Sequence, residues 1–274
     1  MSNRRSQVFI RSVWAYNLDE EFSLIHALLQ QYRFVAIDTE FPGFIYRSQM
    51  PDFLLAAEEF YVLLKSNVDN LQLIQVGLTL FDDNGNLPDL GTHGAFCYAW
   101  EFNLRDFDIR SHRYAPESIN FLSSNGFDFD LLHIHGIDSG LFAQRLVASR
   151  LVGSGSNVEW VTFSGAYDFG YLIKILMGQP LPVRRVDFMR LLTFFFGERL
   201  FDVKSIMRHC HGLYGGLEQV ARTLNVISAG GRPHRAGANS VLAFQTFLEI
   251  RNRFFVDVDV SRHAGEVHGL EKLR

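Results

Sequence analysis

Apolar residues recur at helical spacing in several stretches of the chain. Near the N-terminus, Leu18, Phe22 and Ile25 lie three or four positions apart, and this period predicts a helix over residues 17–31. The same spacing predicts helices over 51–68, 116–124, 138–152, 167–177, 184–196, 216–224 and 237–253. The chain should therefore be rich in helices that bury one face.

Shorter and almost continuous apolar runs predict strands between these helices. They lie at 34–38, 71–81, 95–102 and 158–163. The turn-forming run Asp82-Asp-Asn-Gly85 separates the second strand from the third, so these two should pair as an antiparallel hairpin. Early strands flanked by helices predict an α/β fold with a mixed central sheet that is covered on both faces.

Composition narrows the class of protein. The chain has 274 residues, of which 47% are hydrophobic, and no Pro/Gly/Ser-rich linker divides it, so one domain is expected. Beyond Val256 the chain becomes polar, which predicts a loose tail. Cys97 and Cys210 offer no disulfide framework, which favours a reducing compartment, the cytosol or the nucleus. No signal-peptide core or membrane-length apolar stretch is present, so no membrane attachment is expected.

Charge argues against a general attraction to nucleic acid. The formal net charge is -4, so phosphate binding must come from bound metal or from local basic residues. Arg184-Arg185 and Arg232 with Arg235 are the local candidates, although arginine pairs on loops are more often solvated surface.

The most informative chemical pattern is a pair of carboxylates at the end of a predicted strand. Asp38 and Glu40 end an apolar run just before the Pro42-Gly43 turn. Residues i and i+2 of a strand point to the same face, so the two carboxylates should leave the strand side by side. They repel each other unless cations hold them, so the pair predicts a metal site. The alternative is a solvated Asp-x-Glu at a strand end.

Asp168 is the next candidate ligand. It opens a helix directly after the strand at 158–163, where it could face Asp38 and Glu40. The triplet Asp168-Phe-Gly also binds metal in protein kinases, but the chain has neither a Gly-rich phosphate loop nor a His-Arg-Asp catalytic loop. The alternative is an acidic residue that is favoured by the helix dipole.

His234 lies five residues before Asn239, at the start of the last predicted helix. A lone histidine on a loop is more often solvated or capping than catalytic. Together with the three carboxylates, however, it fits two-metal phosphoryl transfer. Two divalent ions stabilise the attacking and leaving oxygens, and a neutral histidine takes the proton of the attacking water.

These motifs resemble those of the Pop2/Caf-type catalytic subunit of the Ccr-Not deadenylase complex, a DEDDh-type exoribonuclease with the ribonuclease-H-like fold. The resemblance extends over a domain of about residues 9–255, between a flexible N-terminus (1–8) and a polar C-terminal tail (256–274). It includes Ile10–Trp14, Phe34–Gly43, Ser66–Asp69, Ile74–Leu78, Tyr167–Leu172 and Gly215–Leu217.

The resemblance implies a role for each candidate residue. Asp38, Glu40 and Asp168 match metal-binding carboxylates for two divalent ions, magnesium or manganese, and His234 matches the general base. The implied activity is 3'-to-5' removal of poly(A) tails from messenger RNA, in the nucleus and the cytoplasm. The implied partners are poly(A) RNA, a Not-type scaffold subunit and a leucine-rich-repeat deadenylase subunit.

Two aromatic residues follow the carboxylate pair. Phe41 and Phe44 could stack on terminal bases, since stacking tolerates any base and suits a homopolymer. The alternative is that both pack under the turn.

Asn239 departs from the family pattern, which has an aspartate at this position. Asparagine keeps a carbonyl oxygen that can coordinate a hard cation, but it removes one negative charge. At about 4 Å and an effective dielectric near 20, that charge attracts each unit of ion charge by ~4 kcal/mol before desolvation.

Two main hypotheses remain open. The chain is an active or partly active deadenylase, or it is a catalytically silent family member that keeps the fold and binds partners as a scaffold. Asn239 favours the second. DNA proofreading on the same fold is a third alternative.

Overall fold

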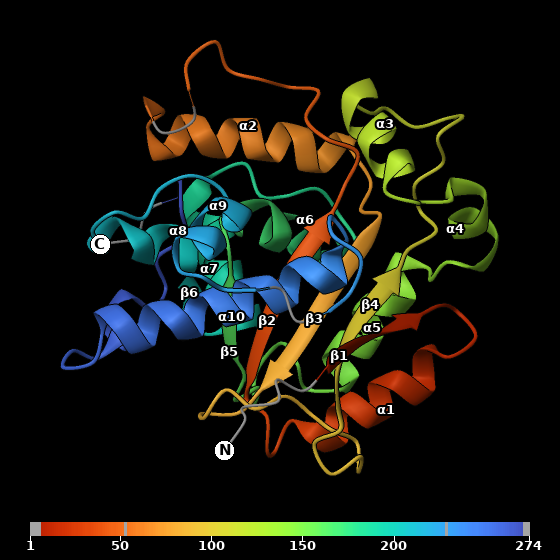
Figure 1. Cartoon of the computed structure of the whole chain (residues 1–274). Coiled ribbons are helices and arrows are strands. Elements are labelled where there is room, and N and C mark those ends of the chain that lie inside the picture. The colour runs from red at the N-terminus through yellow and green to blue at the C-terminus, as the bar shows by residue number, and fades with distance from the viewer. Residues whose placement is uncertain (1–6, 52–53, 228–229, 271–274) are drawn as a thin grey trace.

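The computed structural model describes residues 7–51, 54–227 and 230–270. At its centre is a six-stranded sheet with the order β1-β4-β3-β2-β5-β6 (Figure 1). The strands are β1 (Gln7–Val13), β2 (Phe34–Glu40), β3 (Gln75–Phe81), β4 (Phe96–Asn103), β5 (Glu159–Thr162) and β6 (Leu200–Asp202). β3 is antiparallel to β2 and β4, whereas the other pairs are parallel. The predicted mixed sheet and the hairpin-type pairing are confirmed.

Helices pack on both faces of this sheet (Figure 1). They are α1 (Leu18–Leu28), α2 (Ala57–Asn70), α3 (Pro116–Ser124), α4 (Phe129–His135), α5 (Ser139–Ala148), α6 (Ala166–Met177), α7 (Arg185–Phe196), α8 (Val203–Ile206), α9 (Leu217–Thr223) and α10 (Ala236–Phe254). The described residues also include two short 3-10 helices, η2 (Met207–His209) and η3 (Val260–His263). No helix among the described residues combines the length and apolarity needed to cross a bilayer.

The pleat of β2 divides its residues between the two faces. Val35 and Ile37 pack in the main core with residues of α1, α2, α5, α6 and α7. Phe34 and Ala36 pack on the opposite side, in a core that includes residues of α8, α9 and α10. Since side chains alternate along a strand, Asp38 continues the second set and faces α10.

The sequence pattern misses β1 and several short elements. β1 includes the last two residues of the segment expected to be flexible, 1–8, while residues 1–6 lie outside the described residues. β6 has only three residues, and α4 only seven. The second helix begins at Ala57 rather than near residue 51. Elements of one or two turns, or of three strand residues, carry too few apolar positions to show a period.

The loose tail expected after Val256 is wrong for the residues that the structure describes. Val260, Val267 and Leu270 are buried. The backbone N–H of His268 donates to the carboxylate of Asp202 at 3.0 Å. The segment is polar between these anchors, and the few apolar residues are enough to attach it to the domain. Residues 271–274 lie outside the described part of the chain.

Candidate active site

Asp38 and Glu40 meet Asn239 at the N-terminal turn of α10. The Nδ2 of Asn239 donates to Oδ2 of Asp38 at 3.2 Å and to Oε1 of Glu40 at 3.3 Å. Asn239 follows the two β2 residues by about 200 positions in the sequence, and the structure brings all three together. Their roles as metal ligands stay a prediction.

The neighbouring strand positions α10 against this pair. Gly77 of β3 pairs with Asp38, and a Cβ at Gly77 would lie only 1.9 Å from the backbone oxygen of Ala236. The side-chain Oε1 of Gln75 accepts a hydrogen bond from the Ala236 N–H at 3.1 Å. This bond satisfies one of the free donors that begin every helix. The absence of a side chain at Gly77 and the hydrogen bond to Gln75 therefore position the start of α10, which carries Asn239.

Asp168 reaches the same region from the first turn of α6. Its carboxylate is buried and accepts hydrogen bonds from the hydroxyls of Thr39 and Thr162, the latter at 3.1 Å. Thr39 lies between the two carboxylates of β2, so a single strand contributes to both sides of the site. The two threonines follow no ligand pattern in the sequence, so neither is among the predicted site residues.

A buried carboxylate also holds the turn that leads into α6. Asp202, at the end of β6, accepts from the backbone N–H groups of Ser164 and Gly165 at 2.8 and 3.2 Å. Ser164 has a φ of +63°, a conformation that favours glycine. The Asp202 carboxylate therefore stabilises a strained turn three residues before Asp168.

Crowding of buried carboxylates dominates the electrostatics. Burial, followed by the charges of Asp168 and Glu40, raises the pKa of Asp38 well above its usual range. Burial and the charge of Asp168 raise the pKa of Glu40 to about 8. Burial also raises the pKa of Asp168 to about 7, although bonds from Thr39 and Thr162 oppose the shift. Without a cation, this cluster therefore tends to retain protons at neutral pH.

This donor set fits a magnesium-like ion. Carboxylate and amide oxygens are the ligands that hard divalent cations prefer, and a cation would offset the burial and the repulsion that raise these pKa values. Asn239 acts in two ways here. In the structure, its Nδ2–H groups donate hydrogen bonds to the two carboxylates. Metal ligation would instead require its carbonyl oxygen to face the ion.

His234 lies beside the cluster in a left-handed backbone conformation, with φ of +58°. Its Nδ1 is 3.3 Å from Oε1 of Glu218, and its ring contacts the ring of Phe121 at a centroid distance of 4.9 Å. His234 and Asn239 line the same cavity of about 220 Å³. A carboxylate at Nδ1 favours the tautomer that leaves Nε2 as the proton acceptor. Glu218 directly follows the Gly215–Leu217 motif, but only the structure shows its contact with His234.

Phe41 and Phe44 belong to an aromatic cluster with tyrosines of α6. The rings of Phe41 and Tyr167 are stacked at 5.6 Å, and Phe44 packs edge-on against Tyr167 at 4.8 Å. Phe41 is half-buried, whereas Phe44 is 39% exposed and lines a hollow with Tyr46 and Arg47. Packing therefore accounts for Phe41, and a base-stacking role is better suited to Phe44. Both roles stay predictions.

The arginine candidates differ in their surroundings. Arg184 pairs with Asp187 at 2.7 Å, and Arg185 pairs with Glu58 at 2.8 Å. Arg235 lies over the ring of Phe127 at 4.1 Å and 3.7 Å from the buried carboxylate of Glu101; its charge also lowers the pKa of Glu40. Arg235 is therefore the arginine that contributes positive charge to the carboxylate cluster.

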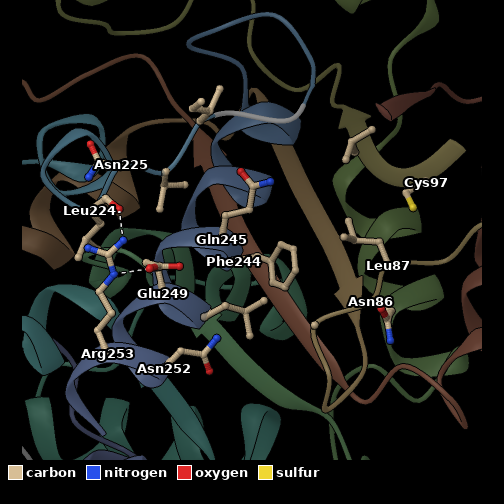
Figure 2. Close-up of a pocket in the computed structure, with 15 residues that line it drawn as sticks. Asn86, Leu87, Cys97, Leu224, Asn225, Phe244, Gln245, Glu249, Asn252 and Arg253 are labelled. Carbon is tan, nitrogen blue, oxygen red and sulfur yellow. Dashed lines mark hydrogen bonds and ion pairs between the residues drawn. The ribbon is translucent and has the colours of Figure 1, made fainter. Parts of the chain in front are cut away.

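A second hollow, of about 580 Å³, lies along the C-terminal half of α10 (Figure 2). Its lining includes Gln245, Glu249 and Arg253, and the guanidinium of Arg253 donates to Glu249 and to the Leu224 carbonyl. None of the predicted site residues lines it. The predicted chemistry is therefore confined to the opposite end of the helix.

Comparison with known proteins decides the family. A family model described as CAF1 family ribonuclease matches residues 13–139. Over 261 residues the chain is 41% identical to the probable CCR4-associated factor 1 homolog 7 of Arabidopsis thaliana, covering 95% of this chain and 93% of that protein. The chain belongs to the CAF1 family of ribonucleases.

Other CAF1-family proteins agree in sequence and fold. The chain is 37% identical to the poly(A) ribonuclease pop2 of Schizosaccharomyces pombe, covering 95% of this chain and 75% of that protein. The structure of S. pombe Pop2p with Mg²⁺ and Mn²⁺ bound has a TM-score of 0.86 and covers 95% of this chain and 99% of that one. A structure of the yeast NOT1 MIF4G domain co-crystallised with CAF1 matches with 30% identity and a TM-score of 0.77, covering 95% and 96% of the two chains. The predicted family and fold class are confirmed.

Proposed function

We propose that this chain is a 3'-to-5' exoribonuclease that shortens the poly(A) tails of messenger RNA. The observation that carries the proposal is the buried cluster of Asp38, Glu40 and Asp168, whose raised pKa values call for cations. Its support from relatives is the similarity of this chain to the poly(A) ribonuclease pop2 of S. pombe and to the structure of S. pombe Pop2p with Mg²⁺ and Mn²⁺ bound.

Each side chain has a distinct part in this proposal. Two divalent ions in the site would supply the positive charge that stabilises the attacking and leaving oxygens. Asp38, Glu40 and Asp168 hold them through carboxylate oxygens, and Asn239 offers its amide oxygen as the fourth ligand. His234 takes a proton from water at Nε2, since Nδ1 faces Glu218.

Base stacking and partners complete the proposal. The exposed ring of Phe44, supported by Phe41 and Tyr167, stacks a terminal adenine of poly(A) RNA. The family and the NOT1 co-crystal favour assembly into the Ccr-Not complex through a Not-type scaffold subunit. A leucine-rich-repeat deadenylase subunit is the second proposed partner, and nucleus and cytoplasm are the proposed locations.

The alternative is a catalytically silent subunit, and Asn239 is the observation that favours it. Its Nδ2 stands against both β2 carboxylates, where the family has a fourth carboxylate. In this alternative the chain keeps the fold and the partner surfaces but binds one metal too weakly for hydrolysis.

Release of AMP from 5'-labelled oligo(A) RNA with Mg²⁺ or Mn²⁺ tests both hypotheses. The natural chain should shorten oligo(A), and Asp168→Asn should slow it by roughly 10³-fold or more, as expected when a metal ligand of a catalytic site is lost. If Asn239→Asp cleaves and the natural chain does not, the chain is a silent member. If neither cleaves in either metal, the nuclease proposal is wrong. Oligo(U) RNA and oligo(dA) DNA then measure the preference for poly(A).

A further inference from the structure

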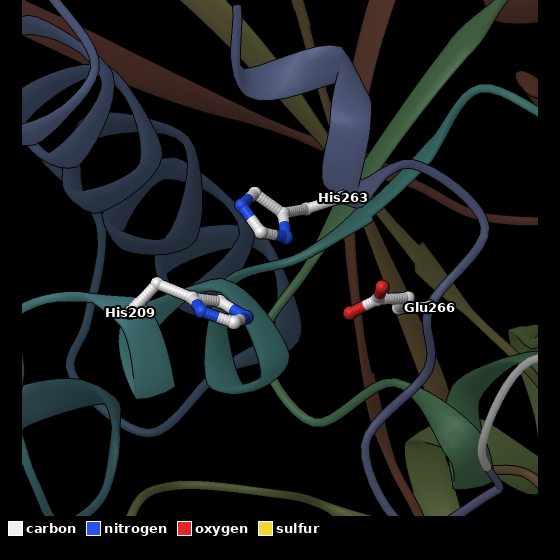
Figure 3. Close-up of side chains that lie close together, drawn as sticks. All are labelled: His209, His263 and Glu266. Carbon is white, nitrogen blue, oxygen red and sulfur yellow. The ribbon is translucent and has the colours of Figure 1, made fainter. Parts of the chain in front are cut away.

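A second group of possible metal ligands lies away from the carboxylate cluster. His209, at the end of η2, His263, at the end of η3, and Glu266 each offer one ligand atom, and these atoms lie within 4.8 Å of one another. Figure 3 shows the carboxylate of Glu266 facing the edges of both imidazole rings. The rings themselves are stacked, with centroids 4.2 Å apart. Two histidines and one carboxylate converge here from two segments of the chain.

The backbone that carries these side chains is well anchored. Glu266 forms a parallel β-bridge with Phe201 of β6, and the N–H of Gly265 donates to the Leu200 carbonyl at 2.7 Å. Met207 and Val260, in the two short helices, are both buried. The side chains can therefore rotate, whereas their Cα positions are set by the fold. Such preorganisation lowers the entropy lost on binding an ion.

The chemistry of the group selects for one class of ion. Imidazole nitrogen favours zinc and similar transition metals, whereas Mg²⁺ prefers oxygen ligands. A neutral imidazole has one ring nitrogen with a free lone pair, and this is the form that binds a metal. The hydroxyl of Ser205 lies 3.4 Å from Oε2 of Glu266 and can orient that carboxylate as an outer partner.

We propose that His209, His263 and Glu266 bind one Zn²⁺ ion, separate from the carboxylate cluster. Ligand atoms of a tetrahedral zinc lie about 3.3 Å apart, given metal–nitrogen distances of about 2.0–2.1 Å. Small rotations of the side chains close the gap from the present separation. A tetrahedral zinc with three protein ligands has one free position. Water can reach this position because His209 is exposed.

The ion fastens the C-terminal segment to the domain. It joins η2 to residues 263–266, just before the point where the His268 N–H donates to Asp202. The same carboxylate holds the Ser164–Gly165 turn before Asp168. Zinc therefore stabilises the C-terminal segment that contacts Asp202, the residue that holds the turn before Asp168. This role does not depend on whether the chain is an active nuclease.

Zinc titration of the full chain tests the site. Calorimetry and thermal unfolding are carried out with excess Mg²⁺, which keeps the carboxylate cluster occupied. The natural chain should bind one Zn²⁺ more than His263→Ala. The unfolding midpoint should rise by roughly 5 °C when free Zn²⁺ is about 100 times its dissociation constant.

Histidine-to-alanine variants distinguish this site from zinc that binds elsewhere on the chain. His209→Ala, at an exposed position, should weaken Zn²⁺ binding by about tenfold or more, because losing a ligand costs at least as much as losing an outer partner. His211→Ala is the matched control, since His211 is also exposed, lies two residues away and is not in the group. The proposal is overturned if His209→Ala and His263→Ala bind Zn²⁺ with the stoichiometry and affinity of the natural chain. It is also overturned if His211→Ala weakens binding as much as they do.

Discussion

Asn239 donates hydrogen bonds to two carboxylates that lie close together on β2. Its Nδ2 donates to both Asp38 and Glu40, and a typical hydrogen bond contributes about 0.5–1.5 kcal/mol net to stability. An aspartate at this position removes both donors and adds a fourth carboxylate to a cluster that already retains protons. The asparagine is therefore better suited to the metal-free protein, and an aspartate to the metal-bound one.

Asn239→Asp should consequently make stability depend more strongly on metal. In EDTA we expect the free energy of unfolding to fall by roughly 1–3 kcal/mol, because two hydrogen bonds are lost and a fourth carboxylate joins the buried cluster. Saturating Mg²⁺ or Mn²⁺ should restore most of this loss. Urea unfolding with and without metal measures the effect. An unchanged stability in EDTA would show that the two bonds of Asn239 contribute nothing.

Glu218 should matter for the rate if His234 is the general base. Glu218→Gln keeps the size of the side chain but removes the carboxylate that lies 3.3 Å from Nδ1. We expect kcat on oligo(A) to fall about tenfold, less than the 10²–10⁴-fold contributed by a general base itself. KM should change less than kcat, because the contact of Glu218 is with the Nδ1 of the proposed base.

Glu198→Gln is the control for this prediction, since Glu198 is exposed and is not among the residues that line the His234 cavity. Equal rates for Glu218→Gln and the control would remove Glu218 from the proposed mechanism.

The sequence predicted the residues of the site that follow a local rule. Asp38 and Glu40 are two apart at the end of a strand, and Asp168 begins a helix, so alternation and element order place them. Thr39, Thr162 and Glu218 follow no such rule. Their partners lie in distant segments, and a threonine or an exposed glutamate has no distinctive spacing.

At the scale of elements, the contact between β3 and α10 determines where the site residues at the start of α10 lie. Gly77→Ala would place a Cβ 1.9 Å from the Ala236 oxygen and 2.5 Å from the Gly237 nitrogen. Both contacts are with backbone, so the helix must move away from β3. We expect a stability loss of about 3 kcal/mol or more, together with a large loss of activity, because Asn239 and His234 move with the helix.

Gly216→Ala provides the matched control for this substitution. Gly216 precedes α9 with a φ of -87°, and a Cβ added there would meet no atom within 4 Å. Its stability should change by no more than about 0.5 kcal/mol. Thermal unfolding and the oligo(A) assay measure both variants. If Gly77→Ala is as stable and active as Gly216→Ala, the close approach of α10 is not required.

The sequence predicted those helices and strands that are long enough to show a hydrophobic period. The apolar positions of α10 and the continuous run of β3 carry clear patterns. β1 alternates imperfectly, and its register comes from the parallel pairing with β4, which sequence spacing does not reveal. The burial of Leu270 likewise depends on tertiary contacts and not on any local period.

At the scale of the whole molecule, the carboxylate cluster links stability to pH and metal. The folded-state pKa of Glu40 is about 8, against an ordinary value of 4.5, and that of Asp168 is about 7, against 3.8. At a pH between the ordinary and the folded-state pKa values, the folded protein holds more protons than the unfolded chain. The free energy of unfolding therefore falls as pH rises from about 4.5 to 8.

Urea unfolding at pH 5.5 and pH 8 tests this link. The charge of Asp168 raises the pKa of Glu40, so the two shifts are not independent and we count them as one. The metal-free protein should then lose about 3 kcal/mol between pH 5.5 and pH 8. With saturating Mg²⁺ the loss should be much smaller, because the cation replaces the protons and keeps the carboxylates ionised in the folded state. Asp168→Asn should also reduce the dependence in EDTA, since it removes one of the repelling charges. Equal slopes with and without metal would mean that the cluster neither retains protons nor binds the cation.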